Sequence, residues 1–257
     1  MCRLFFLIRN NNLEQKAKYI KSFLKQSDHP AKNTPGLDNP YEHVNHKDGY
    51  GFAWRNSNNV KWNAYKSPML YKKDPWIKTH IKDIAQSPII IGHIRNKTTG
   101  ESKIENTHPF VYETQIFVHN GFIENFEMHR NKLLRKIAAK YKPHIKGETD
   151  SEVLFYLFLT ICDKVTENND TNKYKIAFEK MFSSLKRMKL HFFANIIYAN
   201  DKISVITRYS FFPNKTQLSL YLDISNGILI TSEPITPNSV EIEEDSVIVI
   251  QIENHLL

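Results

Sequence analysis

Met1-Cys2-Arg3-Leu4-Phe5-Phe6-Leu7-Ile8 opens the chain and places a thiol directly before a run of consecutive apolar residues. Such a run predicts a buried β-strand. An initiator Met before a small residue such as Cys is usually removed, so we expect the mature chain to begin at Cys2. The freed α-amine could then act as the base for the thiol on the same residue. The alternative is an incidental Cys at a frayed terminus.

The composition is typical of a globular protein. The chain has 257 residues, 41% of them hydrophobic, and we interpret residues 1–257 as a single domain. The apolar run ends at Arg9, too short for a secretory signal or a membrane span. With only two cysteines, Cys2 and Cys162, no disulfide framework is predicted. We therefore expect a cytoplasmic protein with reduced thiols and without a membrane partner.

The net charge of +8 comes from basic residues that are scattered along the chain. No motif combines basic and aromatic residues as nucleic-acid binding requires, so nucleic acid is not an expected partner. A basic surface can still favour acidic partners through its field.

Hydrophobic periodicity predicts strands at both ends of the chain and helices between them. The residues 122–142 carry apolar positions at helical intervals with many Lys and Arg between them, and Cys162 falls on the apolar face of a later helix. The predicted strands are 4–8, 48–54, 60–66, 88–95, 115–118, 191–199, 202–209, 217–223, 227–232 and 246–252. The predicted helices are 13–26, 74–86, 122–142, one that is opened by 147–152 and runs through 161, and 173–189. Proline-rich residues 27–47 predict a loop.

Arg95 is the last residue of the apolar strand predicted over 88–95. A cation at the end of a buried strand needs an anionic partner, and the planar guanidinium suits a carboxylate. The ligand could be a substrate carboxylate, or the partner could be a surface Glu in an ordinary salt bridge.

Asn120 and Gly121 follow the strand at 115–118. Asn-Gly is a strong hairpin-turn signal. The residues that follow have helical spacing, however, and at a strand-to-helix junction the Asn amide and a backbone N–H could point at one spot. Such a pair of donors is what an oxyanion hole requires.

Thr149 and Glu152 have the spacing of a helix capping box. Asp150 lies between them, where its carboxylate could hold an ammonium group. The spacing alone favours the capping role. A ligand with an α-carboxylate, an α-ammonium and an amide carbonyl would satisfy all these candidates, and such a ligand is glutamine or another γ-glutamyl compound.

At this point the sequence resembles the class II glutamine amidotransferases, which are N-terminal-nucleophile hydrolases, and in particular their small stand-alone YafJ-like members. The shared motifs occur in the order of the family and span about the first 60% of the chain. They are Met1-Cys2, DGYG at 48–51, GHIRNKTTG at 92–100, NTHPF at 106–110, HNGFIEN at 119–125 and GETDSE at 147–152.

The resemblance implies an α+β fold, a four-layer αββα sandwich, and a glutamine-hydrolysing activity that needs no cofactor and no metal. Ammonia could pass to a synthase subunit. The implied roles are nucleophile for Cys2, oxyanion hole for Asn120 and Gly121, α-carboxylate binding for Arg95, α-amine binding for Asp150, and pocket lining for Thr98 and His108. Asn96 and Lys97 depart from the family pattern, which leaves the γ-glutamyl substrate open.

Three alternatives compete with this interpretation. A γ-glutamyl amide hydrolase that releases an amine from a peptide or metabolite would use the same residues. A metal site could involve His93, His108 and His119, although no ligand-spacing motif supports it. A non-catalytic binding subunit could retain the fold, and the complete catalytic set argues against that.

Overall fold

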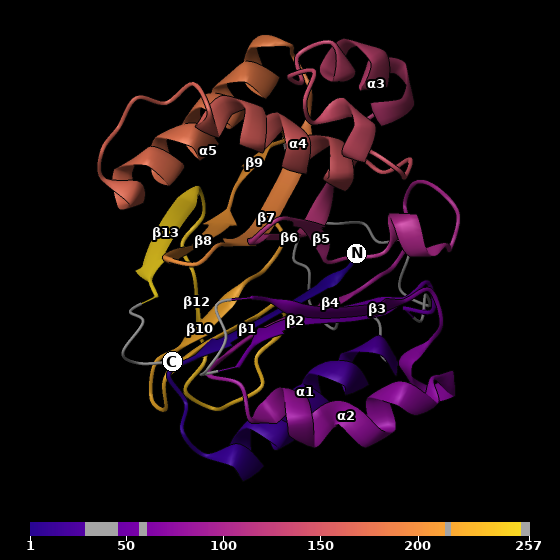
Figure 1. Cartoon of the computed structure of the whole chain (residues 1–257), viewed down its shortest axis with the longest axis vertical. Coiled ribbons are helices and arrows are strands. Elements are labelled where there is room, and N and C mark those ends of the chain that lie inside the picture. The colour runs from indigo at the N-terminus through magenta and orange to yellow at the C-terminus, as the bar shows by residue number, and fades with distance from the viewer. Residues whose placement is uncertain (29–45, 57–60, 214–216, 253–257) are drawn as a thin grey trace.

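Two antiparallel sheets lie face to face in the computed structural model, with helices covering both outer faces (Figure 1). The structure describes residues 1–28, 46–56, 61–213 and 217–252. The arrangement confirms the predicted four-layer αββα sandwich. Among the described residues, no helix has the length and apolar composition that a membrane span requires.

The first sheet has β1 near its middle, between β11 and β4. The strand order is β12 (Val240–Glu241), β10 (Tyr221–Asp223), β11 (Ile228–Thr231), β1 (Arg3–Ile8), β4 (Ile89–Ile94), β2 (Tyr50–Arg55) and β3 (Asn63–Ser67). Because β1 and β4 are antiparallel with Arg3 opposite Ile94, the start of β1 lies beside the end of β4. Cys2 and Arg95 are therefore brought together by strand register alone.

The second sheet is built around the long pairing of β6 with β7. Its order is β13 (Ser246–Gln251), β8 (Ile203–Arg208), β7 (Phe192–Ala199), β6 (Gln115–Ile123) and β5 (Phe110–Tyr112), with β9 (Ser210–Phe211) pairing β7 beyond this path. The β6–β7 register runs from Ile116 opposite Ala199 to Ile123 opposite Phe192.

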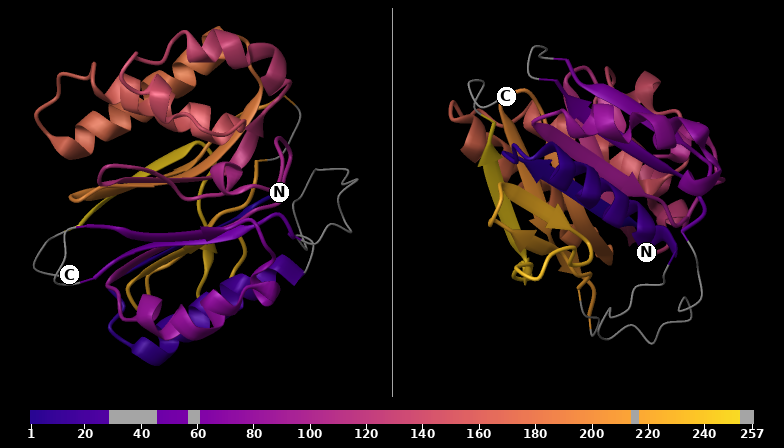
Figure 2. Two further views of the ribbon diagram at one scale, coloured as in Figure 1. Left: turned by 45° about the vertical axis from the view of Figure 1, so that its right-hand side comes forward. Right: turned by 90° about the horizontal axis from the view of Figure 1, so that it is seen from below.

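Alternation along the strands divides the core into layers. Leu4 and Phe6 point into the space between the sheets, whereas Phe5 and Leu7 pack against the helices on the outer face. Helices α1 (Leu13–Lys25) and α2 (Pro75–Ala85) cover the first sheet, and α3 (Phe126–Leu134), α4 (Asp150–Cys162) and α5 (Asp170–Arg187) lie on the side of the second (Figure 2). Short 3₁₀ turns are η1 (Gln26–Asp28), η2 (Tyr71–Lys73), η3 (Ile104–Asn106) and η4 (Lys142–His144).

Two sequence predictions around Asn120-Gly121 are wrong. These residues are neither a hairpin turn nor a strand-to-helix junction, because β6 continues through them to Ile123. The pairing with β7 overrides the local turn preference. The helix predicted over 122–142 is reduced to α3, which begins at Phe126 after Asn125 adopts a left-handed conformation with φ 53°.

Other differences are smaller. The short strands β5, β9 and β12 were not predicted, and the strand predicted over 217–223 is confined to β10. Most of the loop predicted over 27–47 lies outside the described residues.

Candidate active site

A small cavity lies where the start of β1, the end of β4, strand β6 and the start of α4 meet. Its volume of about 20 Å³ is room for about one water molecule. The residues predicted for the site line it, with the exception of Asn120; they are Cys2, Arg95, Thr98, His108, Gly121 and Asp150. Asn96, Lys97, Thr99, His119, Thr149 and Ser151 complete the lining.

Cys2 is partly buried at the edge of this cavity. Its Sγ accepts a hydrogen bond from the Asn96 N–H at 3.4 Å and can donate to the Asn96 carbonyl at the same distance. The Met1 carbonyl accepts from the Arg3 guanidinium at 3.3 Å and lies within hydrogen-bond reach of His46 Nε2. While Met1 is attached, the α-amine belongs to Met1, and Cys2 has only a peptide nitrogen.

Burial raises the pKa of the Cys2 thiol above its ordinary value of 9.0, although the nearby α-amine, the Asn96 hydrogen bond and the Arg95 charge oppose the shift. We expect chains that retain Met1 to alkylate slowly at Cys2, with a rate that rises about tenfold per pH unit through pH 9, because the thiolate is the nucleophile. The rate of Cys2 alkylation by iodoacetamide can be measured from pH 6 to pH 10. Mass analysis of the N-terminal peptide then gives the rate separately for chains that retain Met1 and for chains that have lost it. A plateau below pH 8 in the retaining chains would contradict this.

Arg95 is buried, with 3% of its surface exposed, and makes no ion pair with any described residue. The alternative in which Arg95 forms an ordinary salt bridge with a surface Glu is therefore not observed among the described residues. Its guanidinium donates to a ring of backbone carbonyls, those of Asp48, Thr99, Gly100 and Glu101 at 2.9–3.4 Å. Carbonyls orient the cation without neutralising it, so its charge remains available to a ligand carboxylate.

Asp150 is the first residue of α4, and Thr149 is the N-cap, with its side chain accepting from the Glu152 N–H. The capping prediction is therefore confirmed for Thr149. Asp150 Oδ2 accepts from the Ile123 N–H at 2.8 Å, and Oδ1 accepts from the Ser151 N–H at 2.7 Å and the Ser151 hydroxyl at 3.3 Å. Oδ2 has a further lone pair, so an ammonium group could still be accepted.

Asn120 does not line the cavity, but the strand geometry points its side chain toward the same space as Cys2. Ile116 and Val118 of β6 face the interior between the sheets, so alternation places Asn120 there as well. Cys2 lies two residues before Leu4, which also faces this interior, so the same alternation directs the Cys2 side chain into it. Asn120 is 2% exposed, and its Oδ1 has no hydrogen-bond partner among the described residues.

The three histidines named in the sequence lie close together, and two of them, His108 and His119, line the cavity. The His93 and His108 rings stack with centroids 3.9 Å apart, and His93 Nε2 lies 3.1 Å from the His119 carbonyl. Burial lowers the pKa of His93 to about 3 and lowers those of His108 and His119. These rings are therefore neutral at pH 7. No group of metal-ligating side chains that could hold an ion occurs within the described ranges.

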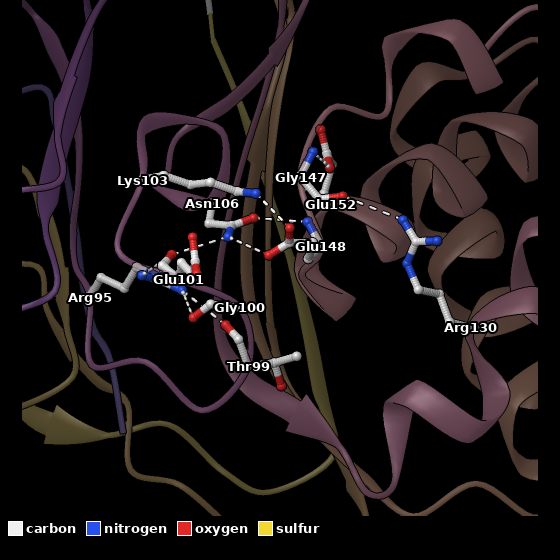
Figure 3. A network of polar contacts seen from close by, with 10 residues as sticks. All are labelled: Arg95, Thr99, Gly100, Glu101, Lys103, Asn106, Arg130, Gly147, Glu148 and Glu152. Atoms are coloured by element: carbon white, nitrogen blue, oxygen red, sulfur yellow. Dashed lines mark hydrogen bonds and ion pairs between the residues drawn. The ribbon is translucent and has the colours of Figure 1, made fainter.

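A network that the sequence did not predict joins both sides of the cavity (Figure 3). Asn106 is fully buried; its amide donates to the Glu101 carbonyl at 3.1 Å and to Glu148 at 3.3 Å, and accepts from the Glu148 N–H at 2.8 Å. The amide is packed between two glycines, because a Cβ on Gly100 or Gly147 would lie 2.7 Å or 2.5 Å from it. Asn106 thus ties the loop around Arg95 to the segment before Asp150.

The only sequence signal for Asn106 was its place at the start of the NTHPF segment. Ser151 and His119 were likewise not assigned to the cavity, although His119 Nδ1 lies 2.9 Å from Ser151 Oγ and joins β6 to α4.

Comparison with known proteins places this geometry in a family. Residues 36–213 match the family model described as glutamine amidotransferases class-II, a range that includes every predicted site residue except Cys2. A protein of Saccharomyces cerevisiae named as probable glutamine amidotransferase DUG3 is 35% identical over 123 residues, which are 46% of this chain and 34% of that protein. A protein of Haemophilus influenzae named "Putative glutamine amidotransferase" is 31% identical over 162 residues, 61% of this chain and 50% of that one.

The fold has a counterpart among solved structures. A glutamine aminotransferase class-II domain protein from Silicibacter pomeroyi superposes with a TM-score of 0.63 over 97% of this chain and 94% of that one, at 19% identity. The curated relatives above are matched over half of their length or less.

Proposed function

The chain belongs to the class II glutamine amidotransferases, and from this premise we propose that it hydrolyses the side-chain amide of glutamine through Cys2. The observation that carries the proposal is the antiparallel register of β1 and β4. It places the Cys2 thiol beside the Arg95 cation in one cavity that Gly121 and Asp150 also line.

In this proposal glutamine is held at its α-carbon by opposite charges. Arg95 binds the α-carboxylate, and Asp150 accepts the α-ammonium group. Thr98 and His108 form walls of the pocket; neither ring nitrogen of the buried His108 has a partner among the described residues. The cavity of about 20 Å³ is too small for glutamine as it stands, so residues that line it must move when glutamine binds.

The chemistry begins once Met1 is removed. The α-amine of Cys2 takes the thiol proton, and the thiolate attacks the amide carbon of glutamine. The amide of Asn120 and the backbone N–H of Gly121 stabilise the oxyanion, a contribution of about 3 kcal/mol per donor. The C–N bond breaks, and the amine returns its proton to the departing ammonia. Water then attacks the γ-glutamyl thioester, which releases glutamate and restores the thiol.

The product ammonia either leaves into solvent or passes to a synthase subunit that uses it. A second candidate function is hydrolysis of a longer γ-glutamyl amide with release of an amine. The exposed side chains of Lys97 and Thr98 favour it, because they leave one wall of the cavity open to solvent.

A substrate panel tests the proposal. We expect glutamine to yield equal amounts of glutamate and ammonia, and Asp150→Asn to raise the KM for glutamine by at least about tenfold, because an ion pair to a buried carboxylate is lost. A γ-glutamyl peptide preferred over glutamine would favour the second candidate. If Cys2→Ala matched the unmodified chain on every γ-glutamyl substrate, neither function would survive.

The Asn106 network gives a further expectation. Asn106→Asp keeps the size of the side chain but removes the donors to Glu101 and Glu148. We expect the KM for glutamine to rise about tenfold with a smaller change in kcat, because the loop that orients Arg95 loses its tie to α4. Ser102→Ala, which removes an exposed hydroxyl from the same loop, is the control. Equal KM values in both variants would show that Asn106 does not position the site.

A further inference from the structure

A second cavity, of about 360 Å³, lies against α3 and η4 and plays no part in the proposed reaction. Its lining combines cationic, amide and aliphatic side chains, and no carboxylate; the residues are Arg130, Asn131, Leu134, Arg135, Lys142 and Ile145. All of them except Ile145 belong to the segment 122–142, in which the sequence interleaves apolar residues with many Lys and Arg.

Helical spacing brings several of the residues that line this cavity to one face of α3. Arg130 and Leu134, and likewise Asn131 and Arg135, are four residues apart, so they lie on one face of α3 and its C-cap. Lys142 begins η4 and approaches from the following turn. Like charges gathered on one concave surface repel one another, and an anion bound between them relieves that repulsion.

These cations lie beyond ion-pair distance of the described carboxylates, although the Arg130 charge still acts on the Glu152 carboxylate. Neither Arg130, Arg135 nor Lys142 forms an ion pair with a residue in the described ranges, whereas the nearby Lys140 pairs with Asp163 at 2.8 Å. In addition, Arg130 Nε is shielded from solvent and has no hydrogen-bond acceptor among those residues. A buried donor without an acceptor is unfavourable, so a rearrangement of the Arg130 side chain that gives Nε an acceptor is favoured.

We propose that this cavity binds a small phosphate-class anion, such as a phosphate ester, and that the bound anion adjusts the glutamine site. Arginine forks match phosphate oxygens bidentately, and the Asn131 amide adds a neutral donor. The volume lies at the low end of the range for small-molecule pockets, which favours a small ligand over a macromolecular surface.

The link to the glutamine site runs through Arg130, and this part of the proposal rests on the proposed function. Arg130 Nη2 donates to the Gly147 carbonyl at 3.4 Å, and the Gly147 N–H donates to Glu152 at 2.7 Å (Figure 3). Gly147 also packs against Asn106, immediately before the segment that carries Asp150. An anion that draws Arg130 toward the cavity loosens its contact with Gly147 and so acts on the start of α4.

Calorimetric titration of the full chain with inorganic pyrophosphate, at fixed ionic strength, tests the binding site. We expect saturable binding to one site, weakened about tenfold by either Arg135→Gln or Lys142→Gln, because each removes a charged donor. Lys132→Gln removes an equal charge from the same helix outside the cavity and should leave Kd unchanged. Absence of saturable binding, or equal weakening by Lys132→Gln, would overturn the site.

Labelling of Cys2 by a γ-glutamyl diazoketone tests the coupling. We expect saturating pyrophosphate to shift the half-saturating concentration of the diazoketone at least about threefold in the unmodified chain, and not in Arg130→Gln. No shift in the unmodified chain would overturn the coupling. If no labelling occurs even without pyrophosphate, the proposed function fails, and the calorimetric result still decides whether the anion site exists.

Discussion

Replacing Asn120 with Ala should lower kcat for glutamine hydrolysis by about 100- to 1,000-fold and leave KM within about threefold of its original value. An oxyanion forms only as the thiolate attacks, so a donor aimed at it stabilises the transition state and not the bound substrate. Steady-state ammonia release measures both constants.

Asn120 is a suitable position for this test because its backbone is held by strand pairing, whereas its side-chain amide oxygen has no hydrogen-bond partner among the described residues. β6 and β7 pair across it, with Asn120 opposite Asn195, and its Oδ1 has no partner in the described part of the chain. Rotation of the amide can therefore present its N–H groups to the site at little cost.

Asn195→Ala is the matched control for that experiment. The Asn195 amide is already committed to the carbonyls of Leu218 and Ser219, both at 3.1 Å. Its loss should lower thermal stability and leave kcat nearly intact. A kcat for Asn120→Ala within about threefold of the original value would remove Asn120 from the oxyanion hole.

Gly121→Ala should destabilise the chain by about 3 kcal/mol or more and lower Tm by roughly 5–10 °C. A Cβ at this position would lie 2.0 Å from the Phe193 carbonyl oxygen and 2.4 Å from His119 Nε2. The carbonyl belongs to the backbone of β7, so the clash cannot be relieved by turning a side chain. Relief requires β6 and β7 to separate where the site is built.

Thermal unfolding followed by circular dichroism checks this expectation. Ala194→Gly changes the residue paired with Gly121 and is the control. It tests whether any substitution in this part of the sheet lowers Tm by a similar amount. It removes a methyl group, and a glycine within a strand should cost only about 1 kcal/mol. Equal Tm values for Gly121→Ala and the unmodified chain would contradict the close approach of β6 to the β7 backbone at Gly121.

The sequence predicted the layers and most elements of the fold because its hydrophobic patterns are strong. The run at 4–8 and the apolar strand at 88–95 were both assigned from local residues. Their register, which brings Cys2 to Arg95, could not be assigned from those residues, since it depends on pairing between segments far apart in the chain. The family resemblance brought these residues together before any geometry was known.

The failures have a common physical origin in long-range contacts. Asn120-Gly121 has the local preference of a turn, yet pairing with β7 holds it extended. Asn106 has no local feature that indicates a buried bridge, because its partners are the Glu101 carbonyl and Glu148. For Asp150, a helix start alone explained the Thr149 to Glu152 spacing, so the spacing favoured capping and only the family resemblance implied a ligand-binding role.

The central claim is that processed Cys2 is the nucleophile of a glutamine-binding site. Intact mass before and after incubation with a γ-glutamyl diazoketone tests it most directly. The account predicts a starting mass without Met1, one covalent adduct, and no adduct in Cys2→Ala. An adduct that persists in Cys2→Ala, or processed chain that gains none at saturating reagent, would contradict it.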